Sequence, residues 1–508
     1  MESATQLSEA LARLPDYLAG HVLVSLAALA LGLTVSLPLG VAAARRPKFR
    51  AGLLGGASVI QTIPGLALLT LFYPLLLALG GLSERLFGAT FSALGFLPAM
   101  LALALYSMLP VMRNTATGLG AITDAVKDAA RAIGLTLRQR LWLVEIPIAL
   151  PVIMAGIRTA AVWVIGTATL STPIGQTSLG NYIFAGLQTQ NWVFVLFGCA
   201  AAATLAITID QLLALIERGL STHNRARVIG GLCGLAIIVM GALLPGAMRP
   251  HESQASYVIG TKPFSEQYVL AALIEQRLEA SGLRATRREG LGSGVIFNAL
   301  AAGEIDVYVD YSGTLWANQM QRSETPSRNV MVNEIGVWLN RQYGISLLGP
   351  LGFENAYALV TKSNRFKSIS DLADRSGEMT IAGDYEFFAR PEWRNLRETY
   401  GLNFRGQRQM QAEFMYPALA DGQVDVIAGY TSDGQIVRFG LTVLQDPKSA
   451  IPPYDALLLV SPKRAADEKF ITALKPLINA ITVEAMREAN RKAAEGMPPA
   501  AVAKTLAR

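Results

Sequence analysis

The chain has 508 residues, of which 52% are hydrophobic and only 16% are charged. Soluble domains carry roughly 25% charged residues, so this composition excludes an entirely soluble protein. The net charge of +6 indicates no nucleic-acid-binding stripe, because much of it lies in short loops between apolar blocks. Residues 18–247 are mostly apolar, whereas residues 255–508 resemble an ordinary soluble protein.

Both cysteines, Cys199 and Cys233, lie in apolar blocks, so the polar half needs no disulfide. The three histidines, His21, His223 and His251, show no metal-ligand spacing, and no metal site is predicted. Acidic residues precede the first apolar block, a pattern that argues against a cleavable signal peptide.

Six apolar stretches are long enough to cross a bilayer, which takes about 20 residues. They are residues 20–44, 53–79, 95–112, 148–170, 192–216 and 228–247. Lys and Arg mark the cytoplasmic side, and they concentrate after the first, third and fifth stretches. This alternation predicts an N-terminus outside the cytoplasm and a sixth stretch that carries residues from 255 onward to the outer face. The alternative is that the sixth stretch is one more helix of the bundle.

Two features inside the apolar stretches carry expectations. Arg158, in the fourth stretch, either snorkels to the interface or faces the bundle interior, and we expect it to snorkel. Prolines in or beside the stretches are tolerated where neighbouring helices or a cavity satisfy the freed backbone groups; they are Pro38, Pro64, Pro110, Pro147, Pro151 and Pro173.

Residues 124–147, DAVKDAARAIGLTLRQRLWLVEIP, are too polar to cross a membrane and too rich in helix formers for a plain loop. The pattern predicts two short helices separated at Gly134. It resembles the signature loop of ABC importer permeases, in which a short helix docks on the ATPase; that family usually has Glu where this chain has Asp128. The alternative is a surface amphipathic loop. The resemblance assigns ATPase coupling to Asp128, Ala129, Ala130, Gly134 and Pro147.

The sequence contains no G-x-x-x-x-G-K-[ST] phosphate loop. The chain is therefore expected to bind no cofactor itself, and ATP with Mg²⁺ to be held by a separate ABC ATPase subunit. The resemblance also implies a permease homodimer.

Strand and helix patterns alternate from residue 257 to the end, which predicts an α/β region. Residues 299–314, ALAAGEIDVYVDYSGT, are weakly repeated as residues 418–433, ALADGQVDVIAGYTSD. Two similar lobes would produce such a repeat, and a generic helix-Gly-strand pattern is the alternative. Ligands bind at the carboxyl ends of parallel strands, so Tyr311 and Tyr430 are predicted to face one cleft.

Residues 255–508 resemble the substrate-binding proteins for glycine betaine, choline and related quaternary amines. The matching segments are IGTKPFSEQ (259–267), DYSGT (310–314), GFENAYAL (352–359), GYTSDGQI (429–436) and PPYDALLLV (452–460). The implied fold class is an α-helical transmembrane permease followed by an α/β two-lobed binding domain. The expected boundaries are 1–220 for the permease, 221–254 for the sixth span and a tether at about 248–256, and 255–508 for the binding domain.

The resemblance implies an aromatic cage for a trimethylammonium group, whose charge favours aromatic faces over hydrogen-bond acceptors. The cage falls on Tyr311, Tyr357, Tyr430 and Tyr454, and each could instead be a core residue with a satisfied hydroxyl. The ligand carboxylate would be held by Lys262, Gln267, Thr314 and Arg390.

The segment GDYEFFARPEW (383–393) departs from the family pattern. Its members are candidates for altered specificity, with packing and helix capping as the alternative: Asp384, Glu386, Phe387, Phe388 and Trp393. A larger betaine such as ergothioneine is conceivable.

The expected function is that of permease and binding subunit of an ATP-driven importer for quaternary amines, in a bacterial inner membrane and with the binding domain outside. The chain is not expected to be an enzyme. Amino-acid cargo is an alternative within transport. A ligand-gated channel or sensor would need no ATPase-docking segment. A membrane-anchored enzyme would need a nucleophile–base pair or a metal cluster, and the chain has no histidine after His251.

Overall fold

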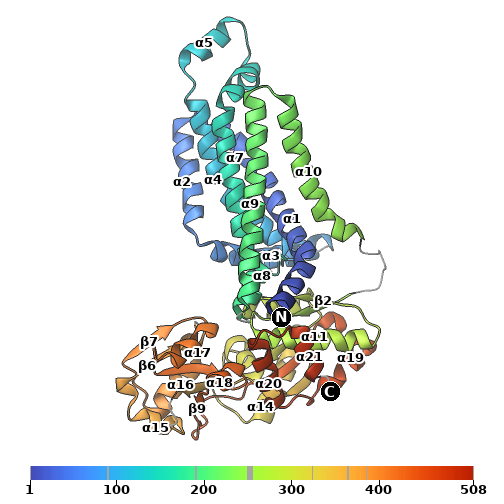
Figure 1. Cartoon of the computed structure of the whole chain (residues 1–508), viewed down its shortest axis with the longest axis vertical. Coiled ribbons are helices and arrows are strands. Elements are labelled where there is room, and N and C mark those ends of the chain that lie inside the picture. Colours follow the sequence, from blue (N-terminus) through green and yellow to red (C-terminus); the bar gives the residue numbers. More distant parts are fainter. Residues whose placement is uncertain are drawn as a thin grey trace. The chain divides into compact units, whose positions relative to one another are not determined.

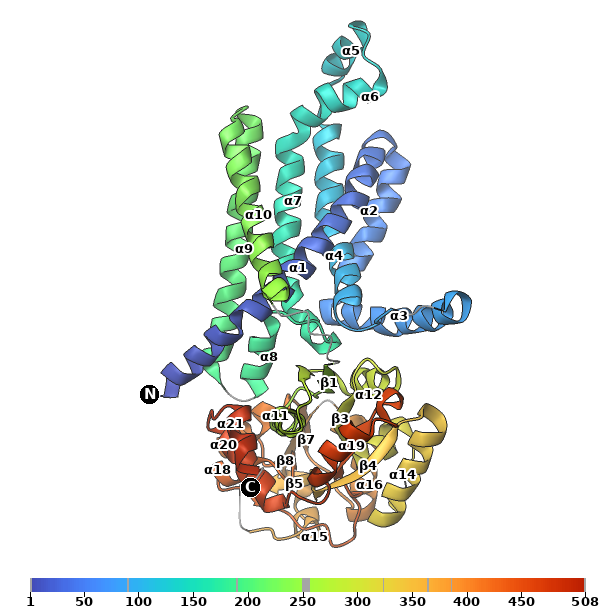
Figure 2. The same ribbon diagram turned by 90° about the vertical axis from the view of Figure 1, so that its right-hand side faces the viewer.

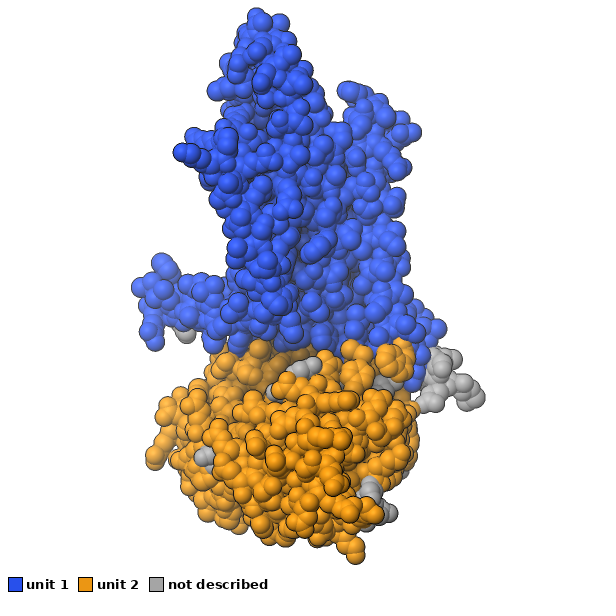
Figure 3. Space-filling view, turned by 90° about the vertical axis from the view of Figure 1, so that its left-hand side faces the viewer, with its two compact units in different colours: residues 1, 3–184, 193–252 blue, residues 2, 185–192, 253–508 orange. Residues whose placement is uncertain are grey.

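The computed structural model describes residues 2–88, 91–188, 191–248, 256–322, 324–362, 365–384 and 386–506. The chain divides into two compact units (Figure 3), one mainly of residues 3–184 and 193–252 and the other mainly of residues 253–508. The tether expected at about 248–256 lies almost entirely outside the described residues.

The first unit is entirely helical in its described residues (Figure 1). Six of its helices are long and apolar enough to cross a membrane. They are α1 (Glu2–Arg45), α3 (Gly65–Phe87), α4 (Phe96–Gly120), α7 (Ile146–Ala168), α9 (Trp192–Ser221) and α10 (Arg225–Met248). The shorter helices are α2 (Pro47–Thr62), α5 (Asp124–Ala132), α6 (Leu137–Arg140) and α8 (Gly180–Gln188).

The single span expected at 53–79 is wrong, because two helices, α2 and α3, replace it. They part at Ile63, whose extended backbone (φ −69°, ψ 126°) precedes Pro64. Proline disfavours helical backbone in the residue before it and donates no N–H. Figure 2 shows α3 running across the direction of the other long helices, whereas α2 runs along α4.

The predicted docking segment forms the two short helices that its sequence pattern indicates. Helix α5 is followed by Gly134 with φ +83°, in the left-handed region that glycine adopts without strain. Thr136 and Gln139 then form a capping box that begins α6. A π-helical turn, Leu141–Glu145, leads into α7. Figure 1 shows this segment projecting from one end of the bundle.

Arg158 does not snorkel as expected but is held between α7 and α9. Its Nε and Nη2 donate to the two carboxylate oxygens of Asp210, each at 2.9 Å, and its Nη1 donates to Glu217 at 3.1 Å. The two carboxylates lie two turns apart on α9, so one guanidinium can reach both. Planar bidentate pairing satisfies the guanidinium donors within the bundle, so the side chain need not extend to the interface.

The second unit contains two five-stranded sheets, each the core of one lobe. The first lobe has the strand order β2-β1-β3-β10-β4 and the second has the order β7-β6-β8-β5-β9. In both, three parallel strands are joined by an antiparallel one. The strands are β1 (Tyr257–Gly260), β2 (Ala285–Arg288), β3 (Val307–Tyr311), β4 (Ser346–Glu354), β5 (Tyr357–Thr361), β6 (Thr380–Gly383), β7 (Gly406–Gln409), β8 (Val426–Tyr430), β9 (Thr442–Val443) and β10 (Asp455–Val460).

Helices flank both sheets, as expected for an α/β region. They are α11 (Ser265–Ala280), α12 (Ser293–Ala301), α13 (Ser312–Thr314), α14 (Arg328–Tyr343), α15 (Ile369–Ala373), α16 (Pro391–Tyr400), α17 (Ala412–Ala420), α18 (Gly434–Arg438), α19 (Glu468–Leu474), α20 (Val483–Ala494) and α21 (Pro499–Leu506). The chain crosses between the lobes from β4 to β5 and again from β9 to β10. The backbone N–H of Asn355 in the first crossing donates to the carbonyl oxygen of Tyr454 in the second, at 3.0 Å.

Candidate functional site

The repeated sequence motifs end on equivalent strands of the two lobes. Tyr311 is the last residue of β3 and Tyr430 is the last residue of β8, and each strand is the middle one of its sheet. Tyr357 opens β5, directly opposite Tyr430 in the antiparallel pair. Tyr454 immediately precedes β10. The fold therefore places all four predicted cage residues at strand ends near the crossings.

Three of the four predicted cage tyrosines have their rings together. The Tyr357 ring centroid lies 5.1 Å from that of Tyr430 and 5.7 Å from that of Tyr454. Burial raises the pKa of all three phenols. Their hydroxyls therefore stay protonated at neutral pH and act as hydrogen-bond donors. Neutral phenol rings held this close can offer several faces to one cation.

Tyr311 stands apart from these three rings. Among the described residues its ring pairs with Phe264, at 6.1 Å between centroids. Its hydroxyl donates to Glu266, and the ammonium of Lys262 lies 5.6 Å from its ring centroid. The Lys262 ammonium of the chain itself thus already lies over the Tyr311 ring.

Two of the predicted carboxylate ligands are bonded within the first lobe. Lys262 is buried and forms an ion pair with Asp310, which also accepts a hydrogen bond from Tyr308. Gln267 donates through Nε2 to the carbonyl oxygen of Val309 and to the Tyr311 hydroxyl, both at 3.1 Å. A ligand carboxylate would have to compete with Asp310 for the lysine.

The other two predicted carboxylate ligands lie in different surroundings. Thr314 is buried in the short helix α13 of the first lobe. Arg390 is buried beside the three tyrosines, with its guanidinium carbon 5.3 Å from the Tyr357 ring centroid and Nη1 3.1 Å from the Tyr454 hydroxyl. Its Nε has no partner among the described residues. Arg390 therefore carries an unused donor next to the ring cluster.

The unusual 383–393 segment supplies two acids beside the ring cluster and Arg390. Asp384 accepts hydrogen bonds from the hydroxyls of both Tyr357 and Tyr430, and from the backbone N–H of Phe387 at 2.6 Å. Glu386 pairs with Arg390. The carboxylate of Asp384 thus both caps a turn and holds the hydroxyls of two predicted cage tyrosines, so the capping and functional interpretations are compatible.

The aromatic residues of this segment extend the ring cluster within the second lobe. The Phe387 centroid lies 5.0 Å from Tyr357 and 5.5 Å from both Phe388 and Trp393. Phe387 and Trp393 are buried. Their burial fits the packing alternative, and a role in specificity stays a prediction.

Glu266 and Glu392 are two buried acids that sequence reasoning did not single out. Glu266 accepts four hydrogen bonds from side chains, and Glu392 accepts one from Tyr454. The sequence signal for Glu266 was its position inside the matching segment IGTKPFSEQ, where an acid lies in the first turn of a largely apolar helix.

In the docking segment the predicted coupling residues share one short stretch. Asp128 is exposed and pairs with Arg131 at 2.9 Å, while Ala130 is buried. Gly134 provides the turn between the helices, and Pro147 lies in the first turn of α7. Exposed apolar side chains accompany them, including Ile133, of which 75% is exposed.

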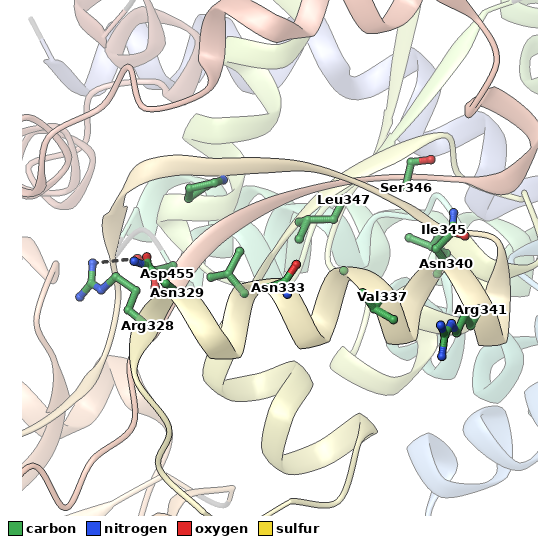
Figure 4. A pocket seen from close by; sticks show the side chains of 13 residues that line it. Arg328, Asn329, Asn333, Val337, Asn340, Arg341, Ile345, Ser346, Leu347 and Asp455 are labelled. Atoms are coloured by element: carbon green, nitrogen blue, oxygen red, sulfur yellow. Dashed lines mark hydrogen bonds and ion pairs between the residues drawn. The ribbon is translucent and has the colours of Figure 1, made fainter.

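A hollow of about 830 Å³ lies elsewhere in the first lobe, between α14 and β4. None of the predicted ligand residues lines it. Figure 4 shows Asn329 and Asn333 of α14 along it, with Arg328 bound to Asp455 at one end. This hollow is separate from the ring cluster.

Two family models match the chain, one in each part. The family described as the binding-protein-dependent transport system inner membrane component matches residues 36–222. The family described as the substrate-binding domain of ABC-type glycine betaine transport systems matches residues 255–507.

Relatives of known function match one part or both. An ergothioneine transport permease/ergothioneine binding protein of Helicobacter pylori is 28% identical over 473 residues, 89% of this chain and 82% of its own length. A glycine betaine/carnitine/choline transport system permease protein of Bacillus subtilis is 40% identical over 198 residues, 39% of this chain and 84% of its own. The crystal structure of a glycine betaine/carnitine/choline ABC transporter is 25% identical, with a TM-score of 0.45, and covers 49% of this chain and 96% of its own.

Both parts of the chain thus have an assigned family, and the helical bundle with its apolar spans and the two-sheet region fit these families. The chain belongs to the binding-protein-dependent ABC import permeases, and it carries a substrate-binding domain of the glycine betaine type in the same polypeptide.

Proposed function

We propose that the chain is the permease and binding subunit of an ATP-driven importer of quaternary ammonium compounds, with the trimethylammonium group held among Tyr357, Tyr430 and Tyr454. The observation that carries this proposal is the cluster of three neutral phenol rings at the strand ends. Each cation–ring contact contributes roughly 0.5–2 kcal/mol, so three rings account for much of the roughly 8 kcal/mol of a micromolar complex.

The ligand carboxylate is assigned first to Arg390. Its Nε is unused and its guanidinium lies beside the ring cluster. Arg390 also pairs with Glu386, but its Nε remains without a partner among the described residues, whereas Lys262 and Gln267 are bonded within the first lobe, so we rank them below Arg390. Tyr311 acts as the outermost member of the cage or as a support for it.

Ergothioneine is the second candidate ligand. The fused relative from Helicobacter pylori matches most of this chain and is named for ergothioneine. The acids Asp384 and Glu386 beside the rings offer acceptors that a simple betaine does not need but that ring N–H groups would use.

We assign the docking site of the separate ATPase to the projecting segment 124–147. Exposed apolar side chains on short helices outside the bundle suit a docking surface. A second copy of the permease would complete the translocation pathway. The proposed location is a bacterial inner membrane with the binding domain on the outer side.

Thermal-shift screening of the full-length chain in detergent tests the ligand. Glycine betaine, choline, carnitine, proline betaine and ergothioneine are compared with proline and glycine. A binder at 100 times its dissociation constant stabilises the folded state by about 2.7 kcal/mol. Tyr430→Ala should raise the dissociation constant of the stabilising compound about tenfold or more.

Stabilisation by proline or glycine alone would contradict the proposal and favour amino-acid cargo. A shift by ergothioneine but not by the simple betaines would select the second candidate. A ligand-gated channel or sensor would instead respond to ligand without any associated ATPase.

A further inference from the structure

Glu266 is a buried carboxylate whose hydrogen-bonding capacity is filled. It lies in the first turn of α11, and 3% of it is exposed. Its Oε1 accepts from the Tyr311 hydroxyl and from Asn355 Nδ2 at 3.2 Å. Its Oε2 accepts from Ser432 Oγ and Asn490 Nδ2, both at 2.7 Å. A carboxylate offers about four acceptor positions, and all are used here.

The four donors come from four different parts of the binding domain. Tyr311 ends β3 of the first lobe, and Asn355 lies in the first crossing between the lobes. Ser432 follows β8 of the second lobe, and Asn490 belongs to α20. One carboxylate therefore ties both lobes and a crossing segment together.

The turn that contains Ser432 is also held from its other side by α20. Arg487 donates from Nε and Nη2 to the carbonyl oxygen of Thr431, at 3.3 and 3.0 Å, and Asn490 donates to that of Ser432 at 2.8 Å. Gly434 packs so closely on α20 that a Cβ there would lie 2.2 Å from the backbone nitrogen of Arg491. This turn immediately follows Tyr430 of the ring cluster.

We propose that Glu266 is a positioning residue at the junction of the lobes, which sets ligand affinity by fixing Tyr311 and the turn after Tyr430 without touching the ligand. The proposal rests on the proposed function, because it assumes that ligand binds beside the ring cluster. Its physical basis is that a ligand held by both lobes is released when they separate, and the Glu266–Ser432 bond opposes that separation.

Two substitutions of Glu266 test whether its hydrogen bonds are needed for ligand affinity. In Glu266→Gln, the side-chain oxygen can accept from Ser432 and Asn490. Its NH₂ group can donate to the Tyr311 oxygen and, after an amide flip, to Asn355 Oδ1, which has no partner among the described residues. Glu266→Ala removes every one of these bonds. The positioning role thus predicts that glutamine preserves affinity and that alanine does not.

The experiment measures the dissociation constant of the full-length chain in detergent for glycine betaine, or for ergothioneine if only that compound stabilises the unmodified chain. We expect Glu266→Ala to raise the constant about tenfold or more, and Glu266→Gln by less than about threefold. Ser432→Ala, which removes only the bond between lobes, should raise it about fivefold, chiefly through faster dissociation.

Ser461→Ala is the matched control. Ser461 is also fully buried in this domain, but its hydroxyl has no partner among the described residues. An unchanged dissociation constant in this variant, beside a raised one in Ser432→Ala, supports the proposal. Equal constants in Ser432→Ala and Ser461→Ala would overturn it, even if Glu266→Ala fails to fold. Absence of binding by the unmodified chain would instead count against the proposed function.

Discussion

Asp433 lies one residue beyond Ser432 and begins helix α18. Its carboxylate accepts a hydrogen bond from the backbone N–H of Gln435 at 2.9 Å. Burial raises the pKa of Asp433 to about 6, against the opposing effect of hydrogen bonds from Gln435 and from the Tyr416 hydroxyl. The folded chain therefore retains this proton over a pH range in which the unfolded chain releases it.

The sign of the pH effect follows from this raised pKa. Between pH 4 and 6 the folded state binds more protons at Asp433 than the unfolded state does, so stability falls as pH rises through this window. Asp433→Asn keeps a capping oxygen and removes the titration. We expect it to stabilise the binding domain at pH 7.5 by about 1–2 kcal/mol and to have little effect at about pH 3.5, below the ordinary pKa of an aspartate, measured by thermal unfolding at both pH values.

Asp371→Asn provides a control of opposite sign. Hydrogen bonds from the backbone of Lys367 and Ser368 lower the pKa of Asp371, so its stabilisation is present at pH 7.5 and is lost as pH falls. If Asp433→Asn changed the free energy of unfolding by the same amount at both pH values, the Asp433 carboxylate would not titrate between them.

The sequence predicts the positions of candidate-site residues where these residues end a strand, but it does not predict their partners. Tyr430, Tyr357 and Tyr454 were singled out from their sequence segments, and their rings lie together; their role in ligand binding stays a prediction. That Lys262 is neutralised by Asp310, and that Glu266 collects four donors, depends on contacts between segments far apart in the chain. No local pattern encodes such partners.

At the scale of elements, the ion cluster of Arg158, Asp210 and Glu217 links α7 to α9. One guanidinium there pairs with two carboxylates, and these side chains are 31%, 22% and 22% exposed. Removing one partner of such a group leaves charge unpaired in a poorly hydrated place, at a cost of several kcal/mol.

We therefore expect Arg158→Leu to lower the stability of the helical bundle by about 2–4 kcal/mol, measured by thermal unfolding of the detergent-solubilised chain. Arg158→Leu combined with Asp210→Leu should recover part of this loss, since one stranded carboxylate is removed. Arg225→Gln, at an exposed arginine that begins α10, is the control. Equal losses in Arg158→Leu and Arg225→Gln would contradict the interpretation.

The same elements show where sequence patterns stop being informative. Apolar length alone gave helices close to α4, α7, α9 and α10, because a continuous run of apolar residues has few other stable states in lipid. It missed the division at Pro64 and the short helix α8. Arg158 was misjudged because snorkelling and pairing both fit its position, and its partners lie on another helix.

For the whole molecule, the prediction with the largest consequence is the side of the membrane that the binding domain occupies. Positive residues follow the first, third and fifth apolar stretches, and α10 adds one further crossing after them. By the positive-inside rule this number of crossings predicts that residues 256–506 lie outside the cytoplasm. The assignment depends on α10, since without it the same domain would remain inside.

Cysteine labelling in whole cells tests this sidedness. Cys199 and Cys233 are first replaced by alanine, and single cysteines are then introduced as Lys504→Cys in α21 or Asp124→Cys in α5, both exposed positions. A membrane-impermeant maleimide should label Lys504→Cys in intact spheroplasts and Asp124→Cys only after permeabilisation. Deleting residues 225–248 from the Lys504→Cys chain should abolish its labelling in intact spheroplasts and leave it labelled after permeabilisation. Labelling from outside that survives the deletion would mean that another segment, and not α10, carries the domain across.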